Sequence, residues 1–317
     1  MLRYSRKSMQ RRYRRAQRIE ENSMKIGFIG LGLMGRPMAG HLAAGGHSLH
    51  LWARRPESLA PFRDSGATLH TSIADVAREA DVVFSMVADA PDVEAVALGP
   101  QGVAEGAAGR ADLIFVDMST IAPDAARSIA ARLAAKGVAM IDAPVSGGEV
   151  GAINAALTIM AGGPQPAFDR VLPLFQLMGK NVTLVGDSGA GQVAKACNQI
   201  LTGVGVLALA EAFAFAEKSG VDAARVREAL LGGFAYSRIL ENHGQRMLDR
   251  NFKPGFKSWM HQKDLRIVMN EAHQMGLALP AAAAAAQMLN AMVGQGLGEE
   301  DSIAVLKVLE GLGGIEG

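Results

Sequence analysis

The stretch Lys25–Leu42 reads KIGFIGLGLMGRPMAGHL, and it decides the fold of the amino-terminal half of the chain. Its first residues, Lys25–Gly30, form a short apolar run that predicts a buried β-strand. The run leads directly into the pattern G-x-G-x-x-G at Gly30, Gly32 and Gly35, and helix-forming residues follow. Strand, glycine turn and helix in this order are the setting in which the pattern indicates a dinucleotide-binding turn.

Each glycine of this turn has a physical role. Gly30 permits the tight turn, Gly32 lets the backbone approach a pyrophosphate, and Gly35 allows the helix to pack closely on the strand. The pyrophosphate would lie at the helix N-terminus, where unpaired N–H groups and the helix dipole favour an anion. The other residues of the turn that we expect at the cofactor are Leu31, Leu33 and Met34. The alternative is a glycine-rich turn without a ligand.

The residues after the second predicted strand, His47–Ala53, bear on the choice of cofactor. An enzyme that uses NAD usually has Asp or Glu there, about 20 residues past the glycines, to bind the ribose 2′-hydroxyl. This chain has Ala53 followed by Arg54 and Arg55. Arginine binds phosphate through two hydrogen bonds, so the pair favours the 2′-phosphate of NADP(H), with NAD(H) as the other possibility. The alternative is two solvated loop arginines.

Further apolar runs alternate with alanine-rich helical stretches, which predicts an α/β domain with a Rossmann-type, parallel, doubly wound sheet. The runs expected to form strands are Asp81–Val87, Leu113–Asp117, Ala139–Asp142, Leu157–Ala161 and Val182–Val185. Ligands in such sheets bind beyond the carboxyl ends of the strands, which draws attention to the loops Met118–Thr120 and Ala143–Gly148. In the second loop, Ser146 and the two glycines after it offer a hydroxyl and open backbone N–H groups that suit a small carboxylate, or form a plain turn.

The β pattern ends near Gly186, and the rest of the chain predicts an all-α domain over residues 187–317. Its first segment, Ser188–Ser219, contains no proline and predicts one long helix. An apolar stripe on this helix comprises Val193, Cys197, Ile200, Val204 and Leu207. The opposite side carries Gln192, Lys195, Gln199 and Thr202, with Asn198 beside them. A buried lysine on that side could be a positioned proton donor, whereas an exposed one would be merely solvated.

Composition limits the functional classes. The chain has 317 residues, of which 49% are hydrophobic and 20% charged, as in soluble globular proteins. Its formal charge of +1 gives no indication of a nucleic-acid partner. Cys197 is its one cysteine, so an intrachain disulfide is impossible, and we expect a reducing, cytoplasmic location. Scattered histidines support no metal site, and no apolar run predicts a membrane span.

The first 23 residues differ from the rest because they are rich in arginine and contain no acid before Glu20. Three interpretations are open for this segment. It is an over-extended start before Met24, a disordered basic tail, or an organelle-targeting peptide. We assign it to no domain and take the dinucleotide-binding domain as residues 24–186.

Several motifs occur in a fixed order along residues 24–317. They are GFIGLGLMGRPMAGHL, DMSTIAP, DAPVSGGEVGA, GAGQVAKACNQI and NFKPGFKSWMHQKDL. Together they resemble the motifs of the β-hydroxyacid dehydrogenase family. The resemblance implies an NAD(P)-dependent oxidoreductase that transfers hydride to a small 3-oxo acid, and a homodimer or homotetramer that pairs through its helical domain. The resemblance implies tartronate semialdehyde, reduced to glycerate, as the expected substrate; 3-hydroxyisobutyrate, succinic semialdehyde and glyoxylate chemistry are alternatives.

The resemblance also implies residue roles. Lys195 matches the catalytic lysine of the family and Asn198 a substrate-binding residue. Lys263 matches a lysine that closes over the nicotinamide. The carboxylate-binding loop corresponds to Ser146, Gly147 and Gly148. Two loops correspond to family positions near the cofactor and substrate. The loop at the end of the predicted strand Asp81–Val87 contributes Val87 and Ala88, and the loop after Leu113–Asp117 contributes Thr120 and, less directly, Ser119.

Two other activities occur on related scaffolds. Imine reductases carry Asp or Tyr where this chain has Lys195, which argues against imine reduction. Non-catalytic reader domains have lost the lysine, and this chain retains both Lys195 and Asn198. The sequence therefore favours a catalytically active reductase.

Overall fold

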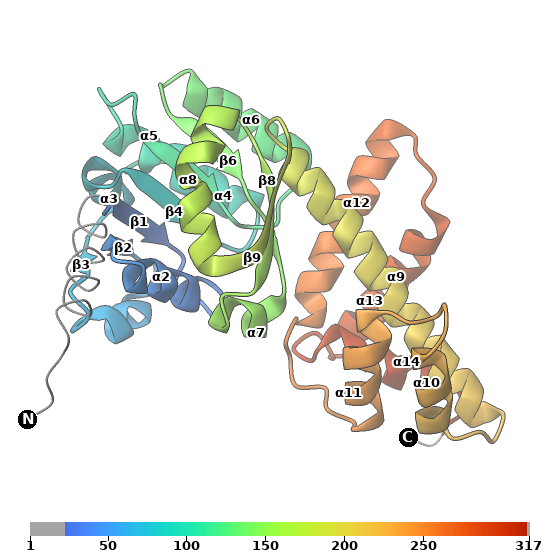
Figure 1. Cartoon of the computed structure of the whole chain (residues 1–317). Coiled ribbons are helices and arrows are strands. Elements are labelled where there is room, and N and C mark those ends of the chain that lie inside the picture. Colours follow the sequence, from blue (N-terminus) through green and yellow to red (C-terminus); the bar gives the residue numbers. More distant parts are fainter. Residues whose placement is uncertain (1–22, 316–317) are drawn as a thin grey trace, which may run out of the picture. The chain divides into compact units, whose positions relative to one another are not determined.

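A computed structural model describes residues 23–315 of the chain (Figure 1). The chain divides into two compact units, the first ending at Val193 and the second beginning at Ala194. The basic segment predicted as an extension falls, except for Ser23, outside the described residues. Ser23 is exposed, and its hydroxyl donates a hydrogen bond to the carbonyl of Gly46.

The first unit is built on one twisted sheet. Its strands are β1 (Lys25–Ile29), β2 (Ser48–Trp52), β3 (Thr68–Leu69), β4 (Val82–Ser85), β5 (Ile114–Asp117), β6 (Ala139–Asp142), β7 (Val145–Ser146), β8 (Leu157–Gly162) and β9 (Gly179–Gly186). Their spatial order is β3-β2-β1-β4-β5-β6-β8-β7, with β9 paired to β8. The pairs from β3 through β6 are parallel, as predicted, but β8 runs antiparallel to β6 and β7. The short strands β3 and β7 were not predicted, because two residues carry no periodic pattern.

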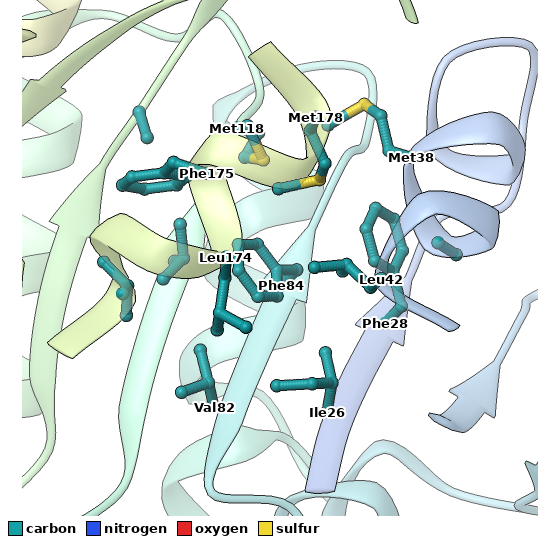
Figure 2. Close-up of a cluster of buried hydrophobic side chains, with 14 of the residues drawn as sticks. Ile26, Phe28, Met38, Leu42, Val82, Phe84, Met118, Leu174, Phe175 and Met178 are labelled. Carbon is teal, nitrogen blue, oxygen red and sulfur yellow. The ribbon is translucent and has the colours of Figure 1, made fainter. Parts of the chain in front are cut away.

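Helices cover both faces of this sheet, as the doubly wound prediction requires. They are α2 (Gly35–Ala44), the 3₁₀ helix η1 (Pro56–Phe62), α3 (Ile73–Glu79), α4 (Ala90–Leu98), α5 (Val103–Gly106), α6 (Pro123–Ala134), α7 (Gly148–Ile153) and α8 (Gln165–Met178). Alternate residues of each strand point to opposite faces. On one face Phe28 and Phe84 pack with Phe175 of α8 and Met38 of α2 (Figure 2). On the other face the strands pack against α3 to α6.

The second unit is helical, as predicted. Its elements are α9 (Ala190–Lys218, whose first turn belongs to the first unit), α10 (Ala223–Leu231), the π-helix η2 (Ile239–His243), α11 (Gly244–Leu248), α12 (Ser258–Met275), α13 (Pro280–Gly294), the 3₁₀ helix η3 (Ser302–Ala304) and α14 (Val305–Gly313). Its core includes Phe213, Leu265 and Met292. Gly203 lets α9 and α12 approach closely, since a Cβ there would lie 3.0 Å from a methyl group of Leu265.

The long helix α9 does not bury its side chains as a simple amphipathic pattern would. Val193 is 41% exposed and Cys197 is exposed, whereas Lys195 and Gln199 on the polar side are buried. By length and composition alone α9 could cross a membrane, which is weak evidence because core helices of soluble proteins meet the same criterion. Burial of its polar side therefore argues for a structured polar site on this helix.

Candidate active site

The glycine turn after β1 has the geometry of a phosphate cradle. Gly30 has φ +93°, and a Cβ there would lie 2.1 Å from the carbonyl oxygen of Met86. A Cβ on Gly35 would lie 1.9 Å from the carbonyl oxygen of Gly30, so neither position accepts a side chain. At Gly32 no atom lies within 4 Å of such a Cβ, and the backbone faces open space. This arrangement fits a dinucleotide pyrophosphate.

The rest of the turn agrees with an anion site. Met34 precedes α2, and no side chain caps this N-terminus. The first N–H groups of a helix lack partners within the helix, and a bound anion can accept from them. Leu31 is buried in the core beneath the turn, whereas Leu33 is 64% exposed beside it. The turn therefore leaves the Leu33 side chain exposed and buries that of Leu31.

Arg54 and Arg55, predicted to bind a 2′-phosphate, both lie exposed after β2 and face carboxylates. Nη1 of Arg54 lies 3.3 Å from Oδ1 of Asp92, at the start of α4. Nε of Arg55 lies 3.9 Å from Oε1 of Glu57. A 2′-phosphate at Arg54 would therefore compete with Asp92 for the guanidinium group.

The turns after β4 and β5 are joined through Ser119. The backbone N–H of Val87 donates to Oγ of Ser119 at 2.9 Å, and this hydroxyl donates to Oδ1 of Asp117 at 2.7 Å. Ser119 is completely buried, so its hydroxyl supports the turn from within. Its neighbour Thr120 is half-buried, and Ala88, next to Val87, is exposed.

Asp117 is a buried carboxyl group, and its hydrogen-bond donors within residues 23–315 are all neutral. Its Oδ1 accepts from the hydroxyls of Ser85 and Ser119 and from the N–H of Ser119. Burial raises the pKa of Asp117 to about 6; these hydrogen bonds oppose the rise, and the charge of Asp142 on the adjacent strand adds to it. Sequence reasoning missed Asp117 as a member of the site, although it stands directly before the predicted loop.

Asp142 and Gln192 fix the first turn of α9 to the carboxyl ends of β5 and β6. Asp142 accepts from the backbone N–H groups of Gly189 and Gln192, at 2.7 and 3.0 Å. The Gln192 side chain donates to the carbonyl of Ser119 and accepts from the N–H of Ile121. Burial raises the pKa of Asp142, and the N–H donors oppose this.

The loop after β6 contains the predicted carboxylate-binding residues. Ser146 ends the short strand β7, and Gly147 and Gly148 follow with φ values of +133° and +61°. Only glycine adopts such φ values readily, so the backbone conformation accounts for glycine at both positions. On the far side of α7, Nε2 of His41 lies 2.9 Å from the carbonyl oxygen of Ala152.

Lys195 is buried, with 7% of its surface exposed. Burial lowers the pKa of Lys195 to about 8; the negative charge of Asp264 raises it, and the positive charge of Lys263 lowers it further. A lysine with this pKa exchanges its proton near neutral pH, as a general acid or base requires. The role of Lys195 as a proton donor stays a prediction.

A chain of polar contacts runs from Asn198 to Lys263. The amide of Asn198 donates to Oε1 of Gln199 at 2.7 Å, and Nε2 of Gln199 donates to Oδ2 of Asp264 at 2.7 Å. Nζ of Lys263 lies 3.0 Å from Oδ1 of Asp264. The structure thus brings Lys195, Asn198 and Lys263 into one cluster around Asp264, which sequence reasoning did not single out.

His261 is a further buried group that sequence reasoning missed. It lies on α12, one turn before Asp264, with its ring centroid 5.3 Å from that of Phe256. Burial lowers the pKa of His261 to about 4, so the ring is neutral at physiological pH; the charge of Asp264 opposes this and that of Lys195 adds to it. The signal available in the sequence was the spacing His261-x-x-Asp264, which places both on one face of a helix.

Metal chemistry receives no support from the part of the chain that the structure describes. Within residues 23–315 there is no group of three or more His, Cys, Asp or Glu side chains that could hold a metal ion. The absence of a metal remains a prediction for the whole chain.

Comparison with protein families gives two matches. Residues 25–186 match the model of the NAD-binding domain of 6-phosphogluconate dehydrogenase. Residues 189–309 match a model described as NAD-binding of NADP-dependent 3-hydroxyisobutyrate dehydrogenase. The 2-hydroxy-3-oxopropionate reductase of Escherichia coli K12 is 44% identical over 291 residues, which cover 90% of this chain and 97% of that protein. The chain belongs to the β-hydroxyacid dehydrogenase family.

Solved structures agree with membership of the β-hydroxyacid dehydrogenases. The 3-hydroxyisobutyrate dehydrogenase of Mycobacterium tuberculosis, solved with L-serine, has a TM-score of 0.83 at 30% identity and covers 90% of this chain and 99% of its own. Psf3, solved with NADP+ and 2-OPP, has a TM-score of 0.80 at 26% identity, with the same coverage. The predicted family, the Rossmann-type fold and the assignment as an NAD(P)-dependent oxidoreductase are confirmed.

Proposed function

We propose that this chain reduces 2-hydroxy-3-oxopropionate (tartronate semialdehyde) to glycerate, with NADPH as the preferred cofactor and Lys195 as the proton donor. The observation that carries the proposal is the buried Lys195, whose pKa of about 8 lets it lose and regain a proton near neutral pH. The 44% identity to a 2-hydroxy-3-oxopropionate reductase supports the choice of substrate.

Lys195 acts on the substrate carbonyl. As an ammonium group it donates a hydrogen bond to the carbonyl oxygen and transfers its proton as alkoxide character develops. The nicotinamide of the bound dinucleotide supplies the hydride. In the reverse direction Lys195, as the neutral amine, accepts the proton of the hydroxy acid.

Other side chains orient the reacting groups. Asn198 binds a substrate oxygen, and its own amide is held by Gln199. Ser146 and the backbone of Gly147 and Gly148 bind the substrate carboxylate, since successive N–H groups at positive φ form a concave anion site. Lys263 would hold the nicotinamide end of the cofactor, as its family counterpart does. A substrate held at its carboxylate by the Ser146 loop and at another oxygen by Asn198 would present one face of its carbonyl to the hydride.

Cofactor binding is assigned to the first unit. The residues proposed to contact the dinucleotide are Gly30, Leu31, Gly32, Leu33, Met34, Gly35, Arg54, Arg55, Val87, Ala88 and Thr120. The absence of an acid at Ala53 and the exposed guanidinium of Arg54 support NADPH over NADH.

A second candidate is a 3-hydroxyisobutyrate dehydrogenase. It is supported by the match of residues 189–309 to the model named for that enzyme. The two candidates share the catalytic lysine and differ in the group that the pocket must accept beside the carbonyl, a hydroxyl or a methyl.

We also propose a homo-oligomer that pairs through the second unit, in a cytoplasmic location. An open apolar hollow of about 540 Å³ on α9 and α10 supports this interface, and Phe215, which lines it, is 76% exposed. Light scattering on the purified protein tests it: wild type should be a dimer or tetramer, and Phe215→Glu should shift it toward the monomer. A monomeric wild type would contradict the interface.

The experiment that tests the activity measures nicotinamide absorbance with a panel of aldehydes. The panel comprises tartronate semialdehyde, methylmalonate semialdehyde, succinic semialdehyde and glyoxylate, each with NADPH and with NADH. We expect the highest kcat/KM for tartronate semialdehyde with NADPH. A higher value for methylmalonate semialdehyde would favour the second candidate, and no turnover with any pair would refute the reductase assignment.

A further inference from the structure

Ser119 and Ser85 are two completely buried serines that share one acceptor. The hydroxyl of each donates to Oδ1 of Asp117 at 2.7 Å. Among the hydrogen bonds that their hydroxyls make within residues 23–315, they differ in one: the Ser119 hydroxyl also accepts from the backbone N–H of Val87 at 2.9 Å. The Ser119 hydroxyl therefore joins the end of β5 to the backbone of the turn after β4, whereas the Ser85 hydroxyl joins the last residue of β4 to Asp117.

The turn that Ser119 holds forms one wall of the glycine turn. Met86, directly before Val87, donates its N–H to the carbonyl of Ile29 at 2.9 Å. A Cβ on Gly30 would lie 2.1 Å from the carbonyl oxygen of Met86 and 3.2 Å from Cγ1 of Val87. A shift of this wall by a few tenths of an ångström therefore changes the surroundings of Gly30.

Ser119 is itself fixed from its backbone side. Its carbonyl accepts from Nε2 of Gln192 at 2.8 Å, and its N–H donates to Oδ1 of Asp117 at 3.3 Å. Gln192 also accepts from the N–H of Ile121 at 3.1 Å. With its backbone held in this way, the Ser119 hydroxyl offers Val87 an acceptor at a fixed position.

We propose that Ser119 is a positioning residue for the dinucleotide: through Val87 it sets the wall of the glycine turn and so determines how tightly the cofactor binds. The inference rests on the proposed function, in which Gly30 to Gly35 hold the pyrophosphate. Ser119 contacts neither cofactor nor substrate in this role. It acts through the backbone of the turn after β4.

The matched variants Ser119→Ala and Ser85→Ala test the proposal. Both remove one hydroxyl from Asp117, so both should lower the melting temperature. Only Ser119→Ala removes the acceptor of the Val87 N–H, which leaves a partly buried donor unsatisfied in the free protein and loosens the turn. Titration of NADPH and NADH, followed by nicotinamide fluorescence, measures the dissociation constants without any aldehyde present.

We expect Ser119→Ala to weaken the binding of both cofactors about tenfold, the effect of roughly one hydrogen bond. Ser85→Ala should change binding by less than about twofold, because it leaves the hydrogen bond from the Val87 N–H to Ser119 in place. Equal dissociation constants for the two variants, or an unchanged constant for Ser119→Ala, would overturn the proposal. If Ser119→Ala does not fold, Ser119→Cys, with a poorer acceptor of similar size, replaces it with the same expectation. A wild-type protein that binds neither dinucleotide would instead refute the proposed function.

Discussion

Asp117 of the first unit and Asp264 of the second are both buried carboxyl groups, but their neighbours differ. Asp117 accepts from two serine hydroxyls and a backbone N–H, and its Oδ2 has no hydrogen-bond partner within residues 23–315. Asp264 accepts from Gln199 and pairs with Lys263, and its charge acts on Lys195. Within the described residues, the donors to Asp117 are all neutral, whereas Asp264 has a cationic partner, Lys263, in addition to the neutral donor Gln199.

The different neighbours give the two carboxyl groups different roles, one in supporting the fold and one in setting the pKa of Lys195. A buried carboxyl group without a cation takes up a proton more readily, which is why the pKa of Asp117 rises to about 6. A buried lysine near both a carboxylate and a second lysine has a pKa that depends on the balance of their charges. The first arrangement holds two turns in place, and the second lowers the pKa of Lys195, the proposed proton donor. The following predictions test this separation.

The largest effect is expected at Lys195. Lys195→Met should lower kcat for reduction by about 10²- to 10⁴-fold, because it removes the proton donor and keeps the length of the side chain. Cofactor dissociation constants should stay within about twofold of wild type, as expected for a group that acts on the substrate. Lys218→Met, at the exposed end of the same helix, is the matched control and should retain wild-type turnover. Near wild-type turnover in Lys195→Met would exclude its role.

Asp264→Asn and Lys263→Met should move the pH profile in opposite directions. The reduction rate requires the ammonium form of Lys195 and should fall as pH rises through about 8. Asp264 raises the pKa of Lys195, so Asp264→Asn moves the falling limb to lower pH. Lys263 lowers that pKa, so Lys263→Met moves the limb to higher pH. The measurement is kcat against pH at saturating substrate, and two limbs displaced in the same direction would contradict this electrostatic account.

Asp117→Asn should change how stability depends on pH. The pKa of Asp117 is raised from 3.8 to about 6, so the folded state binds the proton more tightly than the unfolded state. This group's contribution to stability is therefore present at low pH and is lost as pH rises from about 4 to 6, by at most about 3 kcal/mol. Asp117→Asn should remove this loss, seen as a smaller fall of the unfolding free energy between pH 4 and 6.5. Asp124→Asn, on the exposed surface of α6, is the control, and identical slopes for both variants would contradict the prediction.

The smallest effects are expected at Arg54 and Asp92. Arg54→Ala should raise KM for NADPH roughly fivefold and leave KM for NADH unchanged, because only NADPH carries the 2′-phosphate. Asp92→Asn should lower KM for NADPH by about twofold, since it releases Arg54 from a competing carboxylate. Equal changes with both cofactors would remove Arg54 from phosphate recognition.

Local features of the sequence were sufficient for much of the fold. The apolar run before Gly30 predicted β1, and the breaks at Gly232 and Pro280 coincide with the end of α10 and the start of α13. Two-residue strands such as β7 were not predicted, because two residues are too few to show the alternation of a strand. The antiparallel direction of β8 was not predicted either, because it depends on pairing with other strands. The motif singled out Lys195, whose catalytic role stays a prediction, whereas Asp264 and Asp117 were missed because their importance lies in their neighbours.

The sequence by itself determined the dinucleotide turn, the alternation of strands and helices and the helical second unit, and it singled out Lys195 as the candidate proton donor. These depend on glycine conformation, periodicity and motif order, all of which are local in the chain. Only the tertiary structure decided that the polar side of α9 is buried and that Asp264 and Lys263 act on Lys195. It also showed that Ser119 supports the turn at Val87 from within. Burial and pKa depend on which distant segments meet in space, and no local pattern specifies those contacts.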